Sequence, residues 1–167
     1  AERARMGDVV DPHERVLDMF AGIGYFTLPI ARAGAHVTAV ETNPTAFEFL
    51  ATNTRLNDVE DRVELVLGDC REVVETRIAA GDPRYDRVVM GYYDAFQYLD
   101  AAIDAVAPGG IVHMHEATPE ALLWDRPEGR LREAAAAAGR DVIIRDRRKV
   151  KSHSEGVWHV VLDAEID

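Results

Sequence analysis

Asp18-Met19-Phe20-Ala21-Gly22-Ile23-Gly24-Tyr25-Phe26 is the stretch that decides the fold of this chain. It follows a short apolar run, residues 15–17, that predicts a buried strand, and it precedes residues 27–32, which predict the start of a helix. A strand that turns into a helix through two glycines brings bare backbone amides close to a ligand, because a Cβ would hold the ligand away. The stretch departs from the dinucleotide-binding fingerprint, which has a third glycine at the position of Thr27. The carboxylate of Asp18 would repel a pyrophosphate but suits a cation such as the ammonium group of S-adenosylmethionine (SAM).

Acidic residues also follow the next two predicted strands. Residues 35–40 form an apolar run that leads into Glu41, and residues 63–67 form another that leads through a glycine into Asp69. A carboxylate at the position of Glu41 can accept both hydroxyls of a ribose, and Asp69 can accept an adenine amino group. Asn43 is expected to cap the helix that follows. Because ligands of open α/β sheets bind outside the carboxyl ends of the strands, three acids at successive strand ends predict one nucleoside site.

Length and composition predict a single domain over residues 1–167. The chain has 167 residues and is 47% hydrophobic, which is enough for a core. It has no apolar run of membrane-spanning length, no signal-peptide pattern and one cysteine, Cys70, so we expect a cytoplasmic protein without a membrane partner. The first six residues, Ala1 to Met6, read like the middle of a longer sequence. We therefore expect an N-terminal, RNA-binding part to be absent from this chain.

The chain is strongly acidic, with a net charge of -11. An acidic surface opposes nucleic-acid binding, but acidic composition with few lysines is also typical of halophilic proteins. At molar salt the Debye length falls to about 3 Å, so the charge does not exclude an RNA substrate. One basic cluster exists, which is either a phosphate-contacting edge or a solvated strand face. It comprises Arg145, Arg147, Arg148, Lys149 and Lys151.

Strand and helix patterns alternate along the rest of the chain. Helices are predicted at residues 44–57, 70–81, 95–106 and 131–138, the third of them stopped by Pro108-Gly109-Gly110, and strands at 87–90, 111–115, 142–144 and 157–162. The order predicts an α/β fold. Its doubly wound, mostly parallel seven-stranded sheet would carry helices on both faces and end in an antiparallel strand pair.

Four segments together resemble a known group of enzymes. They are the opening stretch with its continuation to Ile30, Glu41-Thr42-Asn43-Pro44, residues 68–72 and residues 150–161, and residues 2–6 resemble a further segment of the same families. The chain resembles class I SAM-dependent transferases, and more narrowly two sister families that modify tRNA. One is the guanine-37 N1-methyltransferase of archaea and eukaryotes. The other is the wybutosine-pathway enzyme that moves the 3-amino-3-carboxypropyl group of SAM to the same nucleotide of phenylalanine tRNA.

The end of the fourth strand distinguishes the two sisters. The methyltransferases carry Asn-Leu-Pro there, whereas this chain has Met90-Gly91-Tyr92-Tyr93, an open glycine turn without the amide. The resemblance therefore favours the aminocarboxypropyl transferase, as do residues 113–116 and 156–159. Which carbon of the sulfonium reacts is a matter of positioning, so the contacts around the methionine arm must select it. For that role we expect Asp18, Phe20, Ala21, Gly91 and Tyr92.

The resemblance implies a complete set of site residues. SAM is expected to contact Arg5, Asp18, Phe20, Ala21, Gly22, Gly24, Glu41, Thr42, Asn43, Asp69, Cys70 and Gly91. Catalysis is assigned to Gly91 and Tyr92, and Glu2 matches a proton acceptor of the methyltransferase sister. The implied partner is the anticodon loop of phenylalanine tRNA, bound by a monomer, with the basic cluster contacting RNA.

Simpler interpretations apply to several other residues. His113 and His115 share a strand face beside Glu116, but the sequence places no third ligand, so we expect no metal. Cys70 is predicted to be a buried apolar residue rather than a nucleophile. Three functions stay open: aminocarboxypropyl transfer, which we favour, methyl transfer to guanine 37, and SAM binding without catalysis.

Overall fold

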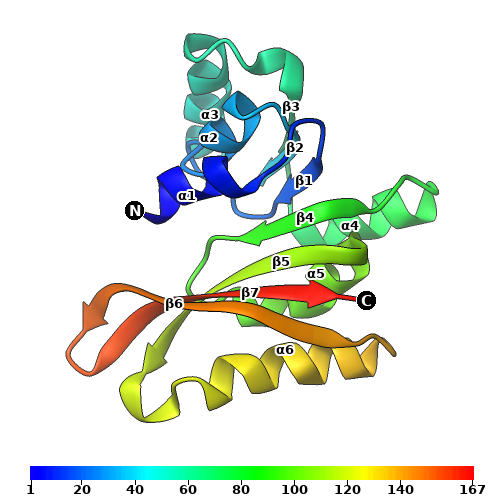
Figure 1. Ribbon diagram of the computed structural model, residues 1–167. Coiled ribbons are helices and arrows are strands. Elements are labelled where there is room, and N and C mark those ends of the chain that lie inside the picture. The colour runs from blue at the N-terminus through cyan, green and yellow to red at the C-terminus, as the bar shows by residue number, and fades with distance from the viewer.

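A seven-stranded sheet runs through the centre of the molecule (Figure 1), in the order β3-β2-β1-β4-β5-β7-β6. The computed structural model describes residues 1–167. The strands are β1 Arg15–Asp18, β2 His36–Glu41, β3 Val63–Leu67, β4 Tyr85–Met90, β5 Val106–Pro119, β6 Val142–Ser154 and β7 Val157–Ile166. Strands β1 to β5 pair in parallel, and β7 pairs antiparallel with both β5 and β6. The predicted fold class is confirmed.

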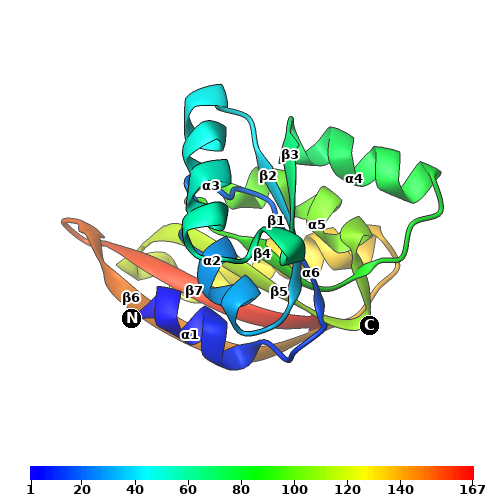
Figure 2. The same ribbon diagram turned by 90° about the horizontal axis from the view of Figure 1, so that it is seen from above.

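Helices cover both faces of the sheet, as the view from above shows (Figure 2). They are α1 Glu2–Val9, α2 Thr27–Arg32, α3 Pro44–Leu56, α4 Cys70–Ala79, α5 Leu99–Ala105 and α6 Asp125–Ala137, with 3₁₀ turns η1 Glu60–Arg62, η2 Ala95–Tyr98 and η3 Glu120–Leu122. One buried cluster includes Met6, Ile30 and Leu50 from α1, α2 and α3. The other includes Ile103 and Leu131 from α5 and α6. Two apolar layers thus enclose the sheet. No helix has both the length and the apolar character needed to cross a membrane.

The topology places the acids predicted for the ligand site at the carboxyl ends of the strands. Asp18 ends β1 beside Ala39 of β2, and Glu41 ends β2 beside Leu67 of β3. The strand order reverses between β1 and β4, which are neighbours in the sheet although β2 and β3 separate them in sequence. Open α/β sheets bind ligands outside the carboxyl ends of the strands at such a switch point.

Several predicted boundaries were wrong, all in the C-terminal half, including those of β5 and of α6, which begins at Asp125. The helix predicted at 95–106 begins as η2 and ends at Ala105, before Pro108-Gly109-Gly110, which belongs to β5. The β4–β5 register shifts between Tyr85 and Arg87, and this bulge accommodates the proline and glycines inside a strand. Strands β6 and β7 are much longer than residues 142–144 and 157–162, so the basic cluster lies on a strand.

Candidate active site

The glycine loop between β1 and α2 has the backbone that its sequence predicts. Gly22 and Gly24 have φ values of +57° and +106°, which favour glycine, and a Cβ on Gly24 would also lie 3.0 Å from the Leu28 side chain. The amide of Ala21 donates to the carbonyl of Val40 at 2.9 Å, which holds the loop against β2. The loop is therefore fixed between two strand ends.

Glu41 joins this loop to the next helix. Its Oε1 accepts from the amide of Gly22 at 3.0 Å, and its Oε2 accepts from the amide of Asn43 at 2.8 Å. Asn43 caps α3 as predicted, because its Oδ1 accepts from the amides of Thr45 and Ala46. Each carboxylate oxygen has a second lone pair, so Glu41 can still accept hydroxyl donors from a ligand.

Two cavities meet beside the loop. We name the first, of about 410 Å³, the Glu41 cavity; it is lined by Met19, Phe20, Val40, Glu41, Thr42, Asp69, Cys70, Gly91, Tyr92 and Tyr98. We name the second, of about 640 Å³, the histidine cavity; it is lined by Ala1, Glu2, Phe20, Ala21, Gly22, Ile23, Tyr25, Phe26, Gly91, Tyr93, His115, Val150, Lys151 and His159. Phe20 and Gly91 line both, so they mark the junction. Most residues predicted to contact SAM thus line one of two adjoining cavities.

Asp69 lies in the wall of the Glu41 cavity with its carboxylate already engaged. It caps α4 by accepting from the amide of Arg71 at 2.8 Å, and the Arg71 guanidinium donates to both its oxygens at 3.1 and 2.7 Å. Hydrogen bonding from Arg71 holds the pKa of Asp69 below its usual value. Beside it, burial and then the charge of Asp69 raise the pKa of the Cys70 thiol to about 11. Cys70 is buried and fits the predicted apolar role rather than that of a nucleophile.

Asp18 lies behind the glycine loop and lines neither cavity, so its contact with the methionine arm stays a prediction. It is fully buried, its Oδ2 accepts from Thr27 Oγ1 at 2.6 Å, and its Oδ1 has no hydrogen-bond partner. Burial raises the pKa of Asp18 to about 6, which the hydrogen bond from Thr27 only partly offsets. Gly24, Asn43 and Arg5 also line neither cavity. Gly24 and Asn43 shape the backbone, and Arg5 donates to Asp163 in an ion network described below.

The turn at Gly91 is filled rather than open. A Cβ at Gly91 would lie 2.7 Å from Cε2 and 3.0 Å from Cδ2 of Phe26. Phe26 in turn lies beside His115, with ring centroids 5.2 Å apart. Glycine is needed here because the Phe26 ring leaves no room for a Cβ, and this corrects the expectation of an open turn.

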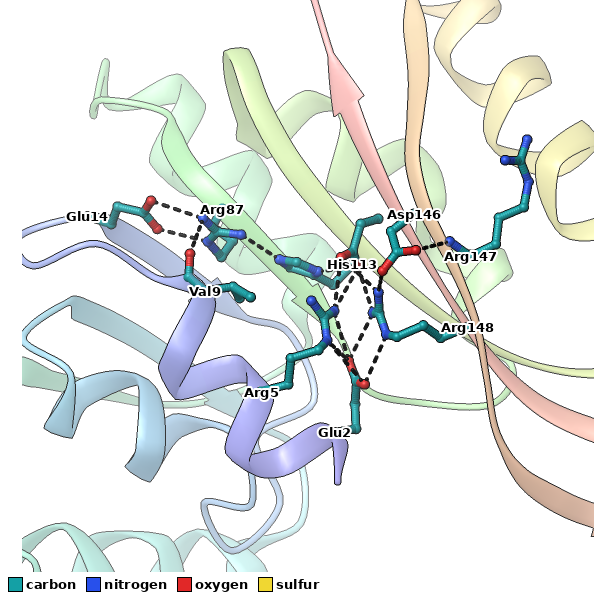
Figure 3. A network of polar contacts seen from close by, with 10 residues as sticks. Glu2, Arg5, Val9, Glu14, Arg87, His113, Asp146, Arg147 and Arg148 are labelled. Atoms are coloured by element: carbon teal, nitrogen blue, oxygen red, sulfur yellow. Dashed lines mark hydrogen bonds and ion pairs between the residues drawn. The ribbon is translucent and has the colours of Figure 1, made fainter.

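A polar network fastens α1 across four strands (Figure 3). Glu2 accepts from Arg5 and from Arg148 of β6, and both arginines also donate to Asp163 of β7. Burial alone would raise the pKa of Glu2, but the hydrogen bonds from Arg5 and Arg148 outweigh it and lower the pKa. Glu2 lines the histidine cavity, yet an ionised carboxylate held by two arginines is a poor proton acceptor.

The network continues through a buried histidine. The guanidinium of Arg87 lies 2.8 Å from Nε2 of His113 and also pairs with Glu14. Because arginine only donates, Nε2 must accept, so Nδ1 carries the proton and donates to Asp163 at 2.6 Å. His113 is therefore neutral, and burial lowers its pKa accordingly. Burial would raise the pKa of Asp163, but its hydrogen bonds from His113 and Arg148 lower it strongly.

The basic cluster does not form a free cationic surface. Arg145 pairs with Glu165, Arg147 with Glu128, and Arg148 with Glu2 and Asp163. Lys149 lies 3.7 Å from Glu120 and above the ring of Trp158. Lys151, in the wall of the histidine cavity, makes no ion pair in the structure. Acids from β7, α1 and α6 neutralise the arginines, which no local sequence pattern reveals.

His113, His115 and Glu116 have separate partners. His113 belongs to the α1 network, and Glu116 faces α6, where it accepts from Arg126 and Arg130. His115 Nδ1 lies 2.9 Å from His159 Nε2 inside the histidine cavity.

Sequence reasoning assigned no site role to Tyr25, Phe26, Tyr93, His115 or His159, which line the histidine cavity. Tyr25 and Phe26 follow β1 and Tyr93 follows β4, the two strands at the switch point, which is the one signal that the sequence offers. His115 and His159 lie within β5 and β7 and carry no such signal.

The sequence model of the TRM5/TYW2 methyltransferase domain matches residues 1–143. The chain belongs to this family. It is 38% identical over 169 residues to the tRNA(Phe) (4-demethylwyosine(37)-C(7)) aminocarboxypropyltransferase of Methanocaldococcus jannaschii, covering 99% of this chain and 65% of that protein. It is 30% identical to the tRNA (guanine(37)-N(1))-methyltransferase Trm5b of Pyrococcus abyssi, covering 97% of this chain and 47% of that protein. This chain therefore spans about two thirds to half of the length of these TRM5/TYW2 relatives.

A solved structure of the family has the same fold. The crystal structure of M. jannaschii TYW2 in complex with AdoMet superposes with a TM-score of 0.90 at 38% identity, covering 99% of this chain and 74% of that one.

Proposed function

We propose that this chain is the catalytic unit of a SAM-dependent transferase that moves the 3-amino-3-carboxypropyl group to the modified guanosine at position 37 of phenylalanine tRNA. The observation that carries the proposal is the filled turn at Gly91, where the methylating sister carries an asparagine. The first carbon of such a side chain would lie only 2.7 Å from Cε2 of the Phe26 ring. The named activity of the 38% identical relative supports the same choice.

The Glu41 cavity fits the adenosine half of SAM. Glu41 offers two carboxylate oxygens, each already oriented by a backbone amide, to the ribose hydroxyls. Apolar side chains such as Met19, Phe20 and Val40 supply walls for a purine, and Asp69 lies at the same cavity. The methionine arm then lies at the junction beside Phe20, Gly91 and Tyr92, while Asp18 supports the loop from behind.

The histidine cavity fits the nucleobase that accepts the group. It adjoins the Glu41 cavity at Phe20 and Gly91, and the aromatic rings of Tyr25, Phe26 and Tyr93 offer stacking surfaces. Lys151 in its wall can contact a phosphate. We expect a monomer to act on tRNA in the cytoplasm, with the phosphate contacts carried by Lys149 and Lys151 more than by the paired arginines.

Transfer of separately labelled SAM tests this function. The complete gene product receives SAM labelled in the methyl or in the carboxyl carbon, with phenylalanine tRNA that carries the tricyclic precursor base. We expect only the carboxyl label in the RNA and methylthioadenosine as the small product. Methyl label in the RNA with release of S-adenosylhomocysteine would contradict the proposal and favour methyl transfer. SAM binding without turnover would favour a SAM-binding module without catalysis.

A further inference from the structure

Alkylation of a ring carbon leaves a proton to be removed. On the proposed function, on which this inference rests, the acceptor atom is C7, a carbon, as the name of the 38% identical relative states. The carbon–carbon bond forms as the carbon–sulfur bond of the sulfonium breaks, and neutral methylthioadenosine leaves. The alkylated ring is then a cation that still holds its C7 proton, and a base must take that proton to restore the aromatic ring. The site therefore needs a proton acceptor beside the nucleobase.

Most ionisable groups in the histidine cavity are unsuited to this task. Glu2 is held by Arg5 and Arg148, and those hydrogen bonds occupy both its oxygens. Lys151 is an ammonium group with donors and no acceptor. The hydroxyls of Tyr25 and Tyr93 accept a proton far less readily than an imidazole does. His115 and His159 are the remaining candidates.

These two histidines form a pair with two free nitrogens. His115 Nδ1 and His159 Nε2 are 2.9 Å apart, and both side chains are buried, with 2% and 9% exposure. His115 Nε2 and His159 Nδ1 are buried without any hydrogen-bond partner. One shared proton lies between the rings, so the neutral pair carries one hydrogen and one lone pair on its outer nitrogens. A buried imidazole nitrogen without a partner is costly, which indicates a group that a ligand completes.

The two rings can also pass a proton along. A proton accepted at one outer nitrogen lets the shared proton shift to the other ring, and the opposite outer nitrogen then releases its own. His159 lies nearer the surface, and Tyr93 contacts both His159 and the exposed His153, with ring centroids 4.9 and 4.6 Å apart. His159 is therefore the ring of the pair on the solvent side, from which a proton would leave.

We propose that the His115–His159 pair accepts the proton that the base loses after alkylation and hands it toward solvent. The pair lies in the wall of the cavity that adjoins the SAM site, on β5 and β7, where paired strands fix both rings. The two histidines thereby take the role of proton acceptor that the resemblance implies for Glu2.

The surroundings keep the pair neutral and ready to accept. Burial and then the adjacent His159 lower the pKa of His115 to about 3, and burial and then Lys151 lower that of His159. The charged or titratable groups that face the pair are Glu2 of α1, His113 of β5, and Arg148, Lys151 and His153 of β6. The alkylated ring is a strong acid, so a weakly basic imidazole with an unpartnered nitrogen can take its proton. The pair differs from Glu2 in this free lone pair, because arginines already occupy both oxygens of Glu2.

Two variants remove the basicity and keep the shared hydrogen bond. His115→Asn places an amide where Nδ1 lies, and His159→Gln places one where Nε2 lies. His36→Gln is the matched control, because His36 is exposed at the start of β2, far from the carboxyl ends of the strands. Steady-state kinetics with the complete gene product are compared with SAM affinity by calorimetry, and with turnover of tRNA deuterated at C7.

We expect both variants to lose about 100-fold or more in kcat, the usual contribution of a positioned base, with SAM affinity and the KM for tRNA unchanged. Deuterium at C7 should slow the variants and leave the wild type unaffected, because proton removal becomes the slow step. A wild-type kcat in either variant, or a raised KM at unchanged kcat, would overturn the proposal. Failure of the wild type to transfer the group would instead overturn the proposed function itself.

Discussion

Replacing Glu41 by alanine should separate ligand binding from loop support. In the structure the carboxylate accepts from two backbone amides, and the bound ribose would add its hydroxyls to the same two oxygens. A hydrogen bond to a charged group is worth about 1.5–3 kcal/mol, and partial exposure of Glu41 favours the lower end. Because 1.4 kcal/mol is about tenfold in affinity, Glu41→Ala should weaken SAM binding by about tenfold or more.

The same change removes the tie between the glycine loop and α3. The amides of Gly22 and Asn43 can turn to water, so the free energy of unfolding should fall by only about 1 kcal/mol. Titration calorimetry measures the affinity, and thermal unfolding shows that the variant is folded. Glu48→Ala is the control, since Glu48 is exposed on α3 and makes the same change of charge. A folded Glu41→Ala protein with unchanged SAM affinity would refute the assignment of the ribose site.

Three further outcomes follow from the geometry. Asp18→Asn should stabilise the protein over the wild type at pH 8 but not at pH 4. The pKa of Asp18 is raised from 3.8 to about 6, so the wild type is stable with a neutral Asp18 at low pH and loses that stability as pH rises through 6; calorimetric melting of both proteins at both pH values measures this. Gly91→Ala should cost about 1–3 kcal/mol of stability by overpacking against Phe26, and Phe26→Leu in the same chain should relieve it in urea unfolding. Neutralising Lys149 and Lys151 should flatten the salt dependence of tRNA binding by about 0.9 in slope for each lost phosphate contact, and an unchanged slope would place the phosphates elsewhere.

Local signals explain which parts of the fold could be predicted. The strand, glycine loop and helix from residue 15 to 32, and the cap at Asn43, depend on residues within one or two turns of each other. The wrong boundaries depend on distant partners. Pro108 lies inside β5 because a bulge opposite Tyr85 and Arg87 absorbs it, and pairing with β7 extends β6 far beyond its apolar residues.

Local patterns also explain which features of the candidate site could be predicted. The backbone around Glu41 and the glycines follows from geometry that a motif encodes, while their contacts with SAM stay a prediction. The sequence did not reveal that Arg71 already pairs with the Asp69 carboxylate, a pairing with which a ligand would have to compete. Phe26 and Gly91 are 65 positions apart, so the contact that fills the turn emerges from the packing of the loop beside β4.

The α1 network shows why a motif residue can change its role in a related enzyme. Glu2 lines the histidine cavity, but its ion pairs with Arg5 and Arg148 are part of a chain that reaches Glu14 through Asp163 and His113. Protonating Glu2 would leave two half-buried arginines with one fewer acceptor, so the network resists the step that a general base must take. The same arginines fix α1 against β6 and β7, and thereby hold Glu2 in the wall of the histidine cavity. A carboxylate used in this way shapes the cavity, and the unpaired imidazole nitrogens beside it are then the groups free to accept a proton.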